Sequence, residues 1–163
     1  MVETPAAILN AGAIAACRAQ VPQLQGFVIG TNDLVKDTGV LPGEHRAHLL
    51  PWLMTAVAAA KAHDLAVLDG VFNDFSDLDG LAAEAAQGRA LGMTGKTLIH
   101  PKQIAPANAA FSPSEEEVSQ ARRIVEAFDT DEAAGRGVIT LDGKMVERLH
   151  LEMAQRTLER AAG

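Results

Sequence analysis

The sequence predicts an α/β fold built from parallel strand–helix–strand units. Three short apolar segments, 24–30, 65–71 and 95–101, are expected to be buried strands. Helix-like patterns separate them, and continuously apolar strands are typical of parallel sheets that are covered on both faces. With 163 residues and 48% hydrophobic content, the chain is long enough to bury a core.

Proline and glycine residues mark the predicted boundaries of the elements that precede the second strand. Met1–Glu3 has the pattern of a strand end, so we expect it to lie in the same sheet. A helix is predicted from Thr4 to about Gln20, because Pro22 breaks the pattern there. The polar stretch 31–45 is expected to be a loop, because it is punctuated by Gly39, Pro42 and Gly43.

The middle of the chain predicts two further helices. One spans His45–His63, and Pro51 within it marks either the helix start or a kink. The other spans Asp77–Ala90, with Asp77 as its N-cap. These helices complete an alternation of strands and helices that favours a parallel sheet.

A different pattern follows Pro113. Ser114 and Glu117 match the S-x-x-E capping box, which predicts the start of a helix. The segment 135–146 has the pattern of a β-hairpin with Asp142-Gly143 as its turn. A last helix is expected over Val146–Ala161.

Composition excludes several classes of partner. The net charge is −7 and no cluster of Lys and Arg occurs, which argues against nucleic acid or an anionic membrane. No apolar run reaches the ~18 residues of a membrane span. Glu3 and the lack of a basic start argue against a signal peptide, so we expect a cytoplasmic protein. Cys17, in an Ala-rich pattern, is expected to be a small buried residue rather than a nucleophile.

Polar residues follow the predicted strands, at the edge where parallel sheets gather functional groups. Glu3 and Asp33 are expected to converge there. Two carboxylates suit Mg²⁺, which takes few protein ligands and keeps positions for a substrate. The alternative is a surface glutamate and an aspartate that caps the following loop. Asp69 and His100 follow the other two strands at the same edge.

Five segments stand in a recognisable order along essentially the whole chain: VETPAAILNAGAIA, GFVIGTNDLVKDTG, LDGVFNDFSDLDGL, GKTLIHPKQI and GKMVERLHLEMA. Together they resemble the citrate lyase β-subunit-like CoA ester lyases. This is the malyl-CoA and citramalyl-CoA lyase group of the HpcH/HpaI aldolase superfamily.

The resemblance implies the C-terminal half of a TIM (β/α)₈ barrel, with about four βα units in residues 1–112. Residues 113–163 would form a hairpin and helical extension that packs on the barrel or on a neighbouring subunit. The family's first four strands and its carboxylate-clamping Arg have no match. We therefore expect a fragment, a truncated product or half of a split protein, which associates and has weak or no activity alone. A homo-oligomer is expected, because the family forms trimers or hexamers.

The activity that the resemblance implies is Mg²⁺-dependent, Claisen-type cleavage of a 3-hydroxyacyl-CoA of the malyl-, citramalyl- or citryl-CoA type. The products are a small 2-oxoacid and an acyl-CoA. Glu3 and Asp33 match the Mg²⁺ ligands, and Asn32 stands where the family often has an acidic residue. The alternatives are a CoA-thioester hydrolase of the malyl-CoA thioesterase type, or an inactive module that only oligomerises.

Other site residues are also carried by the resemblance. Glu147 matches an acid/base that reaches a neighbouring subunit, and the alternative is an exposed glutamate in the first turn of a helix. We expect Asp69, Gly70 and His100 to line the substrate site, although His100 could instead satisfy backbone groups at the strand end. Two lysines could meet CoA phosphates or stay solvated: Lys96 and Lys102.

Overall fold

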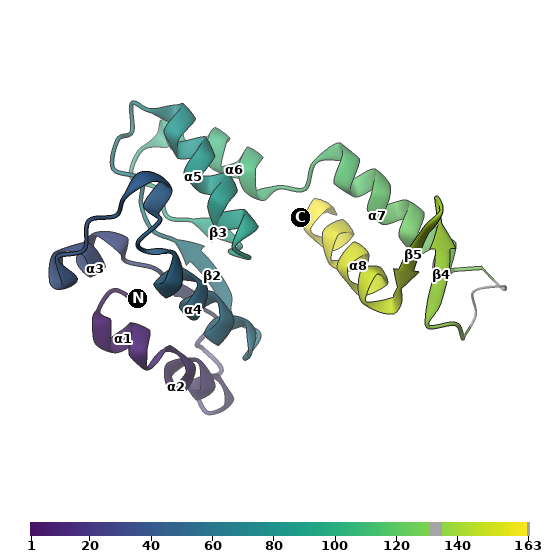
Figure 1. Cartoon of the computed structure of the whole chain (residues 1–163), viewed down its shortest axis with the longest axis horizontal. Coiled ribbons are helices and arrows are strands. Elements are labelled where there is room, and N and C mark those ends of the chain that lie inside the picture. The colour runs from purple at the N-terminus through teal and green to yellow at the C-terminus, as the bar shows by residue number, and fades with distance from the viewer. Residues whose placement is uncertain (131–134, 163) are drawn as a thin grey trace. The chain divides into compact units, whose positions relative to one another are not determined.

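The computed structural model describes residues 1–130 and 135–162, which fall into two compact units, Met1–Phe111 and Ser112–Gly163 (Figure 1). The division lies within one residue of the boundary expected from the sequence. How the second unit packs on other parts of the protein stays a prediction.

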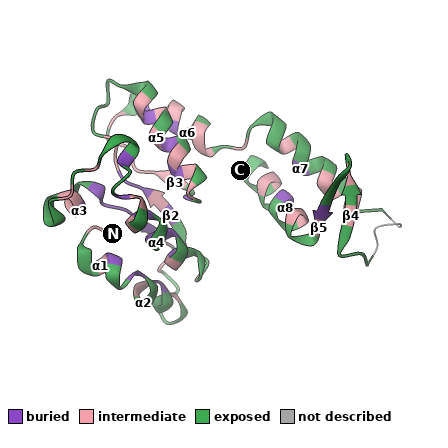
Figure 2. Ribbon diagram, viewed as in Figure 1, coloured by how far each residue is buried: buried purple, intermediate pink, exposed green. Residues whose placement is uncertain are grey.

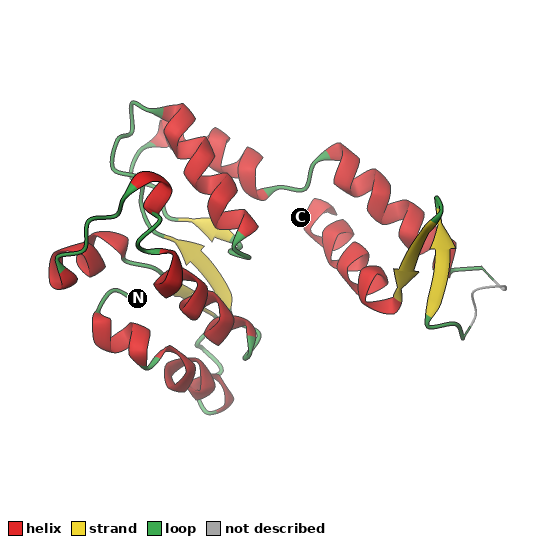
Figure 3. Ribbon diagram, viewed as in Figure 1, coloured by secondary structure: helices red, strands yellow, loops and turns green. Residues whose placement is uncertain are grey.

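A parallel sheet forms the centre of the first unit. Its strands lie in the order β1 (Gly26–Val28), β2 (Ala66–Asp69) and β3 (Gly95–Lys96), drawn as yellow arrows in Figure 3. Val2 forms a parallel bridge with Ile29, so the N-terminal segment joins the sheet beside β1. The α/β class and the parallel pairing are therefore confirmed.

Helical segments connect the strands of this unit, and two more follow β3. In chain order they are α1 (Pro5–Leu9), α2 (Ala11–Ala16), η1 (Cys17–Ala19), α3 (Thr31–Thr38), η2 (Glu44–Arg46), α4 (Leu50–Lys61), α5 (Leu78–Ala90), η3 (Pro101–Gln103) and α6 (Ile104–Phe111). Pro51 lies in the first turn of α4, so the alternative of a helix start there is the right one. Asp77 caps α5 as predicted, because its side chain accepts from the Gly80 N–H at 2.9 Å.

The core lies between the sheet and helices α2 and α4 (Figure 2). Ala15, Ala56 and Ala60 are fully buried, and such small side chains let these two helices approach closely. Leu53 and Val67 fill the space between α4 and β2, also with no exposed surface. Each fully buried side chain of this size stabilises the fold by about 1.5–3 kcal/mol.

The expectation of a loop over residues 31–45 is wrong, because its first half forms helix α3. Gly30 is the N-cap of this helix, and Gly39 ends it with a φ of +71°, the left-handed conformation that glycine adopts without strain. Leu34 is buried on its inner side. Asp33 therefore belongs to the first turn of a helix rather than to a loop.

Three smaller expectations also need correction. The strand predicted at 95–101 forms only at Gly95–Lys96, because Pro101 starts η3 and α6 follows where no helix was expected. The helix predicted from Thr4 to Gln20 is divided at Asn10, which ends α1 and begins α2. Cys17 is exposed rather than buried, and its Sγ lies 3.4 Å from the Ala13 carbonyl oxygen.

The second unit is a helical pair with a hairpin: α7 (Glu115–Phe128), β4 (Val138–Leu141), β5 (Lys144–Glu147) and α8 (Arg148–Ala162). The predicted capping box is present, since Ser114 Oγ accepts from the Glu117 N–H and the Glu117 carboxylate accepts from the Ser114 N–H. Asp142 and Gly143 both have positive φ, as a tight hairpin turn requires. The last helix begins two residues later than expected, because Val146 pairs with Ile139 in the hairpin.

Membrane-spanning helices can be ruled out for the described part of the chain, where no helix combines sufficient length with sufficient apolar character.

Candidate functional site

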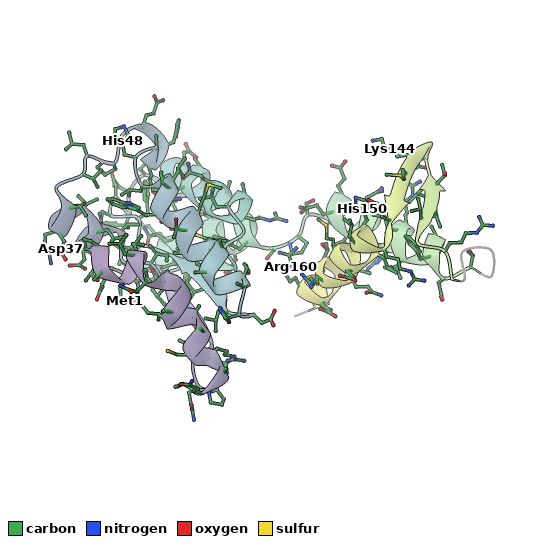
Figure 4. The ribbon with its side chains drawn as sticks, turned by 60° about the horizontal axis from the view of Figure 1, so that its bottom comes forward. Met1, Asp37, His48, Lys144, His150 and Arg160 are labelled. Carbon is green, nitrogen blue, oxygen red and sulfur yellow. The ribbon has the colours of Figure 1, made fainter. Side chains whose placement is uncertain are left out.

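Glu3 and Asp33 are brought to the same edge of the sheet by the pairing of the N-terminal segment with β1. The Gly30 N–H donates to the Val2 carbonyl oxygen at 2.9 Å, which places Glu3 beside Gly30. A Cβ on Gly30 would overlap the Glu3 Cβ and lie 2.9 Å from Glu3 Oε2. The Glu3 side chain thus lies across Gly30, the N-cap of α3, and Asp33 follows in the first turn. Figure 4 labels Met1 and Asp37, which belong to the two segments that carry these carboxylates.

The Asp33 carboxylate is 47% exposed and accepts a hydrogen bond from Lys36 Nζ at 2.9 Å. This hydrogen bond, and then the charge of Asp33, raise the pKa of Lys36 above its ordinary value. The ion pair lies at the surface, so it restrains Asp33 only weakly. The carboxylate is therefore accessible to a cation that competes with Lys36.

The donor chemistry of this pair fits Mg²⁺. In the described residues no group of three His, Cys, Asp or Glu side chains could hold a metal. A closed structural site of the zinc type is therefore not formed there. Mg²⁺ is commonly held by one or two carboxylates, with water and substrate as its other ligands. Glu3 and Asp33 meet that requirement, with Gly30 leaving the room that the Glu3 side chain occupies.

Asp69 lies at the end of β2 but faces inward, where its carboxylate is the centre of a buried ion cluster. Arg46 Nη1 donates to both carboxylate oxygens, at 2.8 and 3.0 Å, and Lys96 Nζ donates to one of them at 3.1 Å. Lys96 also donates to the Gly70 carbonyl oxygen at 2.7 Å and to Glu84 at 2.5 Å. Asp69 and Lys96 have no exposed side-chain surface. The expectation of a solvated Lys96 is therefore wrong, while the substrate role of Asp69 stays a prediction.

Gly70 is in close contact with the start of α3. A Cβ there would lie 2.5 Å from Thr31 Oγ1 and 3.0 Å from the Ile29 carbonyl oxygen. Any larger residue would push the loop after β2 away from β1 and α3. Gly70 thus shapes the same edge of the sheet as Glu3 and Asp33, and its substrate role stays a prediction.

His100 satisfies a backbone group at the end of its predicted strand segment, which is the alternative to a role in substrate binding. Its Nδ1 accepts from the Lys102 N–H at 3.1 Å and caps η3. The imidazole stacks on Phe75 with ring centroids 4.8 Å apart and planes 12° apart. A role in substrate binding stays a prediction, because these contacts already explain the residue.

Two asparagines form a contact that sequence reasoning missed. Asn32 in α3 and Asn73 in the loop after β2 exchange side-chain hydrogen bonds at 2.9 and 3.0 Å. Nothing in the spacing of two exposed polar residues 41 positions apart signals this pairing. Arg46 was missed as well, because a single arginine near a loop has the pattern of a solvated charge.

Glu147 belongs to the second unit and ends strand β5, opposite Val138. Its backbone N–H donates to His150 Nδ1 at 2.9 Å. The alternative that placed it in the first turn of a helix is wrong, because the hairpin continues through this residue. Its side chain is partly buried, and its role as an acid/base stays a prediction.

Comparison with known proteins shows the family to which the chain belongs. The family model described as HpcH/HpaI aldolase/citrate lyase matches residues 1–101. This chain belongs to that family, as its motifs predicted.

Individual relatives carry two different enzyme names. The chain is 47% identical to a (3S)-malyl-CoA thioesterase of Cereibacter sphaeroides over 161 residues, 99% of this chain and 55% of the relative. It is 34% identical to an L-malyl-CoA/beta-methylmalyl-CoA lyase of the same organism, over 95% of this chain and 53% of the relative. The chain thus spans about half the length of the curated relatives it matches.

A solved structure shows the same fold. CitE from Mycobacterium tuberculosis, in complex with magnesium, acetoacetate and coenzyme A, is 30% identical with a TM-score of 0.78. The match covers 96% of this chain and 58% of that protein.

Proposed function

We propose that this chain carries the metal-binding part of a CoA-ester enzyme, and that its reaction is hydrolysis of a malyl-CoA-type thioester. The observation that carries this proposal is the difference between the two relatives, 47% identity to the thioesterase against 34% to the lyase. Both comparisons cover almost all of this chain, so the difference is not an effect of coverage. Both relatives are named for malyl-CoA esters, which supports a CoA ester as the substrate class of this chain.

Glu3 and Asp33 are the residues that would hold Mg²⁺. When bound, Mg²⁺ supplies Lewis-acid stabilisation of the oxygen on which negative charge develops. The chain's own contribution is to present two carboxylates at one edge of the sheet, with Gly30 leaving room for the Glu3 side chain. The CitE complex with magnesium, acetoacetate and coenzyme A supports this choice of metal within the family.

Hydrolysis requires a proton carrier as well as a binding site. A water oxygen adds to the thioester carbonyl, the C–S bond breaks, and free acid and CoA thiol leave. We assign Glu147 of a neighbouring copy of the chain to accept the water proton and to return it to the departing thiolate sulfur. Among the described residues the Glu147 carboxylate forms no hydrogen bond or ion pair, whereas the Asp69 carboxylate is held by Arg46 and Lys96, which supports the availability of Glu147 for this role.

Claisen-type cleavage on the same scaffold is the second candidate, favoured by the lyase relative. In that reaction the 3-hydroxyl loses its proton, the C–C bond breaks, and a 2-oxoacid leaves. The resulting thioester enolate then takes a proton to give the acyl-CoA. Glu147 would accept the hydroxyl proton and deliver it to the enolate carbon, so the two candidates use the same acid/base in different steps.

We further propose that the first unit is part of an eight-stranded barrel. Within the described residues, β3 pairs only with β2, and the N-terminal segment pairs only beside β1. Such open sheet edges require additional strands or a partner chain to be covered. Ile99 and Ile104, which follow β3, are 52% and 50% exposed, which supports a covering partner here.

Product analysis tests the proposal. The chain is incubated with malyl-CoA and Mg²⁺, its mass in solution is measured in parallel, and products are identified by mass spectrometry. A small yield of malate with free CoA is the expected result, because the chain spans about half of its relatives, and both products should be lost in Glu3→Gln. Glyoxylate with acetyl-CoA would move the assignment to the second candidate. Neither product, together with no Mg²⁺-dependent binding of malyl-CoA, would overturn both.

A further inference from the structure

We propose that Asn73 is a positioning residue for Asp33 and acts through its reciprocal amide pair with Asn32. The inference rests on the proposed function, because it concerns the same metal-binding carboxylate. Asn32 Nδ2 donates to Asn73 Oδ1 at 3.0 Å, and Asn73 Nδ2 donates to Asn32 Oδ1 at 2.9 Å. The pair joins the first turn of α3 to the loop after β2, two segments 41 residues apart.

The loop that carries Asn73 is held to η3 on one side of this residue and is ordered by its own hydrogen bonds on the other, so it can serve as an anchor. The Phe72 carbonyl oxygen accepts from Nε2 of the fully buried Gln103 at 2.9 Å. On the other side, the Asp74 carboxylate accepts from the Ser76 hydroxyl and backbone N–H, which lowers the pKa of Asp74. Asn73 thus lies between two residues that are fixed by their own contacts.

The same loop touches the start of α3 at a second point. Gly70 is in close contact with the buried Thr31, as the 2.5 Å separation between a Cβ there and Thr31 Oγ1 shows. Thr31 and Asn32 are the two residues that precede Asp33. Both are therefore tied to the loop after β2, while the described contacts of the Asp33 carboxylate itself involve only exposed Lys36.

An amide pair suits this task chemically. Each asparagine uses one donor and one acceptor on the other, so the pair orders the turn without adding a charge. Asp33 is left as the anionic ligand of this turn. The Asn32–Asn73 pair restrains the neighbouring backbone and so sets the orientation of the Asp33 carboxylate. Residues that orient metal ligands in this way commonly change metal affinity when they are replaced.

The test compares Asn32→Ala, Asn73→Ala and the double variant with the wild-type chain. Asn108→Ala, an exposed asparagine in α6, is the matched control. Mg²⁺ alone is titrated by calorimetry, and hydrogen exchange is followed at the Leu34 N–H, which donates to the Gly30 carbonyl oxygen in the first turn of α3.

Each single variant should weaken Mg²⁺ binding about fivefold, the cost of about one hydrogen-bonded pair. Exchange at the Leu34 N–H should accelerate by a similar factor. The double variant should bind Mg²⁺ no more weakly than either single variant, because each single substitution already removes the same Asn32–Asn73 contact. A lower melting temperature with unchanged Mg²⁺ affinity overturns the positioning role and leaves the proposed function intact. A wild-type chain that binds no Mg²⁺ overturns both.

Discussion

Replacement of Lys96 by methionine should strongly destabilise the first unit. The ammonium group would be lost from a buried cluster in which it contacts the Asp69 carboxylate at 3.1 Å, Glu84 at 2.5 Å and the Gly70 carbonyl oxygen at 2.7 Å. Removing one partner of a buried ion pair typically costs 3–5 kcal/mol, because the other charge stays desolvated. Arg46 still contacts both Asp69 oxygens, so we expect the lower end, about 3 kcal/mol.

This loss is large for a unit of this size. Met1–Phe111 is expected to have a free energy of unfolding of about 5–15 kcal/mol. A loss of about 3 kcal/mol should lower the melting temperature by roughly 10–20 °C, measured by calorimetry or circular dichroism. Lys61→Met, at an exposed position in α4, is the matched control and should shift it by no more than about 2 °C. Equal, small shifts in the two variants would refute the view that the Asp69 cluster stabilises the unit.

Two further changes act at the carboxylate pair. Gly30→Ala should force the Glu3 side chain away, lower stability by about 1–3 kcal/mol and weaken Mg²⁺ binding, because the new Cβ would overlap Glu3. Gly12→Ala, whose Cβ would meet no atom within 4 Å, should do neither, and equal effects of the two would contradict the steric argument. Lys36→Met should tighten Mg²⁺ binding roughly twofold at neutral pH, because the Lys36 ammonium group competes with the ion for the Asp33 carboxylate. Asp33 raises the pKa of Lys36, so the ammonium group stays charged until the pH exceeds the ordinary pKa of lysine. Unchanged or weaker binding in calorimetry would show that Lys36 and the ion do not compete for Asp33.

Much of the fold could be predicted because its signals are local. The strand at Ala66–Asp69 is signalled by the apolar run from Leu65 to Leu68, which ends at Asp69. Asp77 and Ser114 each cap a helix with their own side chains, three residues from the N–H that they bind. Helix α3 was missed because Leu34, its one buried apolar residue, stands among polar residues that usually form turns.

The position of Glu3 and Asp33 at one edge could be predicted because it depends on strand ends, while their role as metal ligands stays a prediction. Glu3 follows a strand directly, and Asp33 follows one within a few residues, so parallel pairing brings the two to one edge. The buried cluster could not be found in this way, since Arg46 lies 23 residues before Asp69 and Lys96 lies 27 residues after it. Charged side chains are usually solvated, and only the tertiary fold shows which are paired inside.

The central claim is that Glu3 and Asp33 together hold Mg²⁺, and a calorimetric titration of the 163-residue chain tests it most directly. The wild-type chain should bind one Mg²⁺. Glu3→Gln and Asp33→Asn should each weaken this binding by roughly tenfold or more, because each removes a ligand charge while keeping the side chain's size. Asp37→Asn, at the exposed end of α3, should bind as the wild type does. Equal Mg²⁺ affinity in the wild type and both ligand variants would contradict the account.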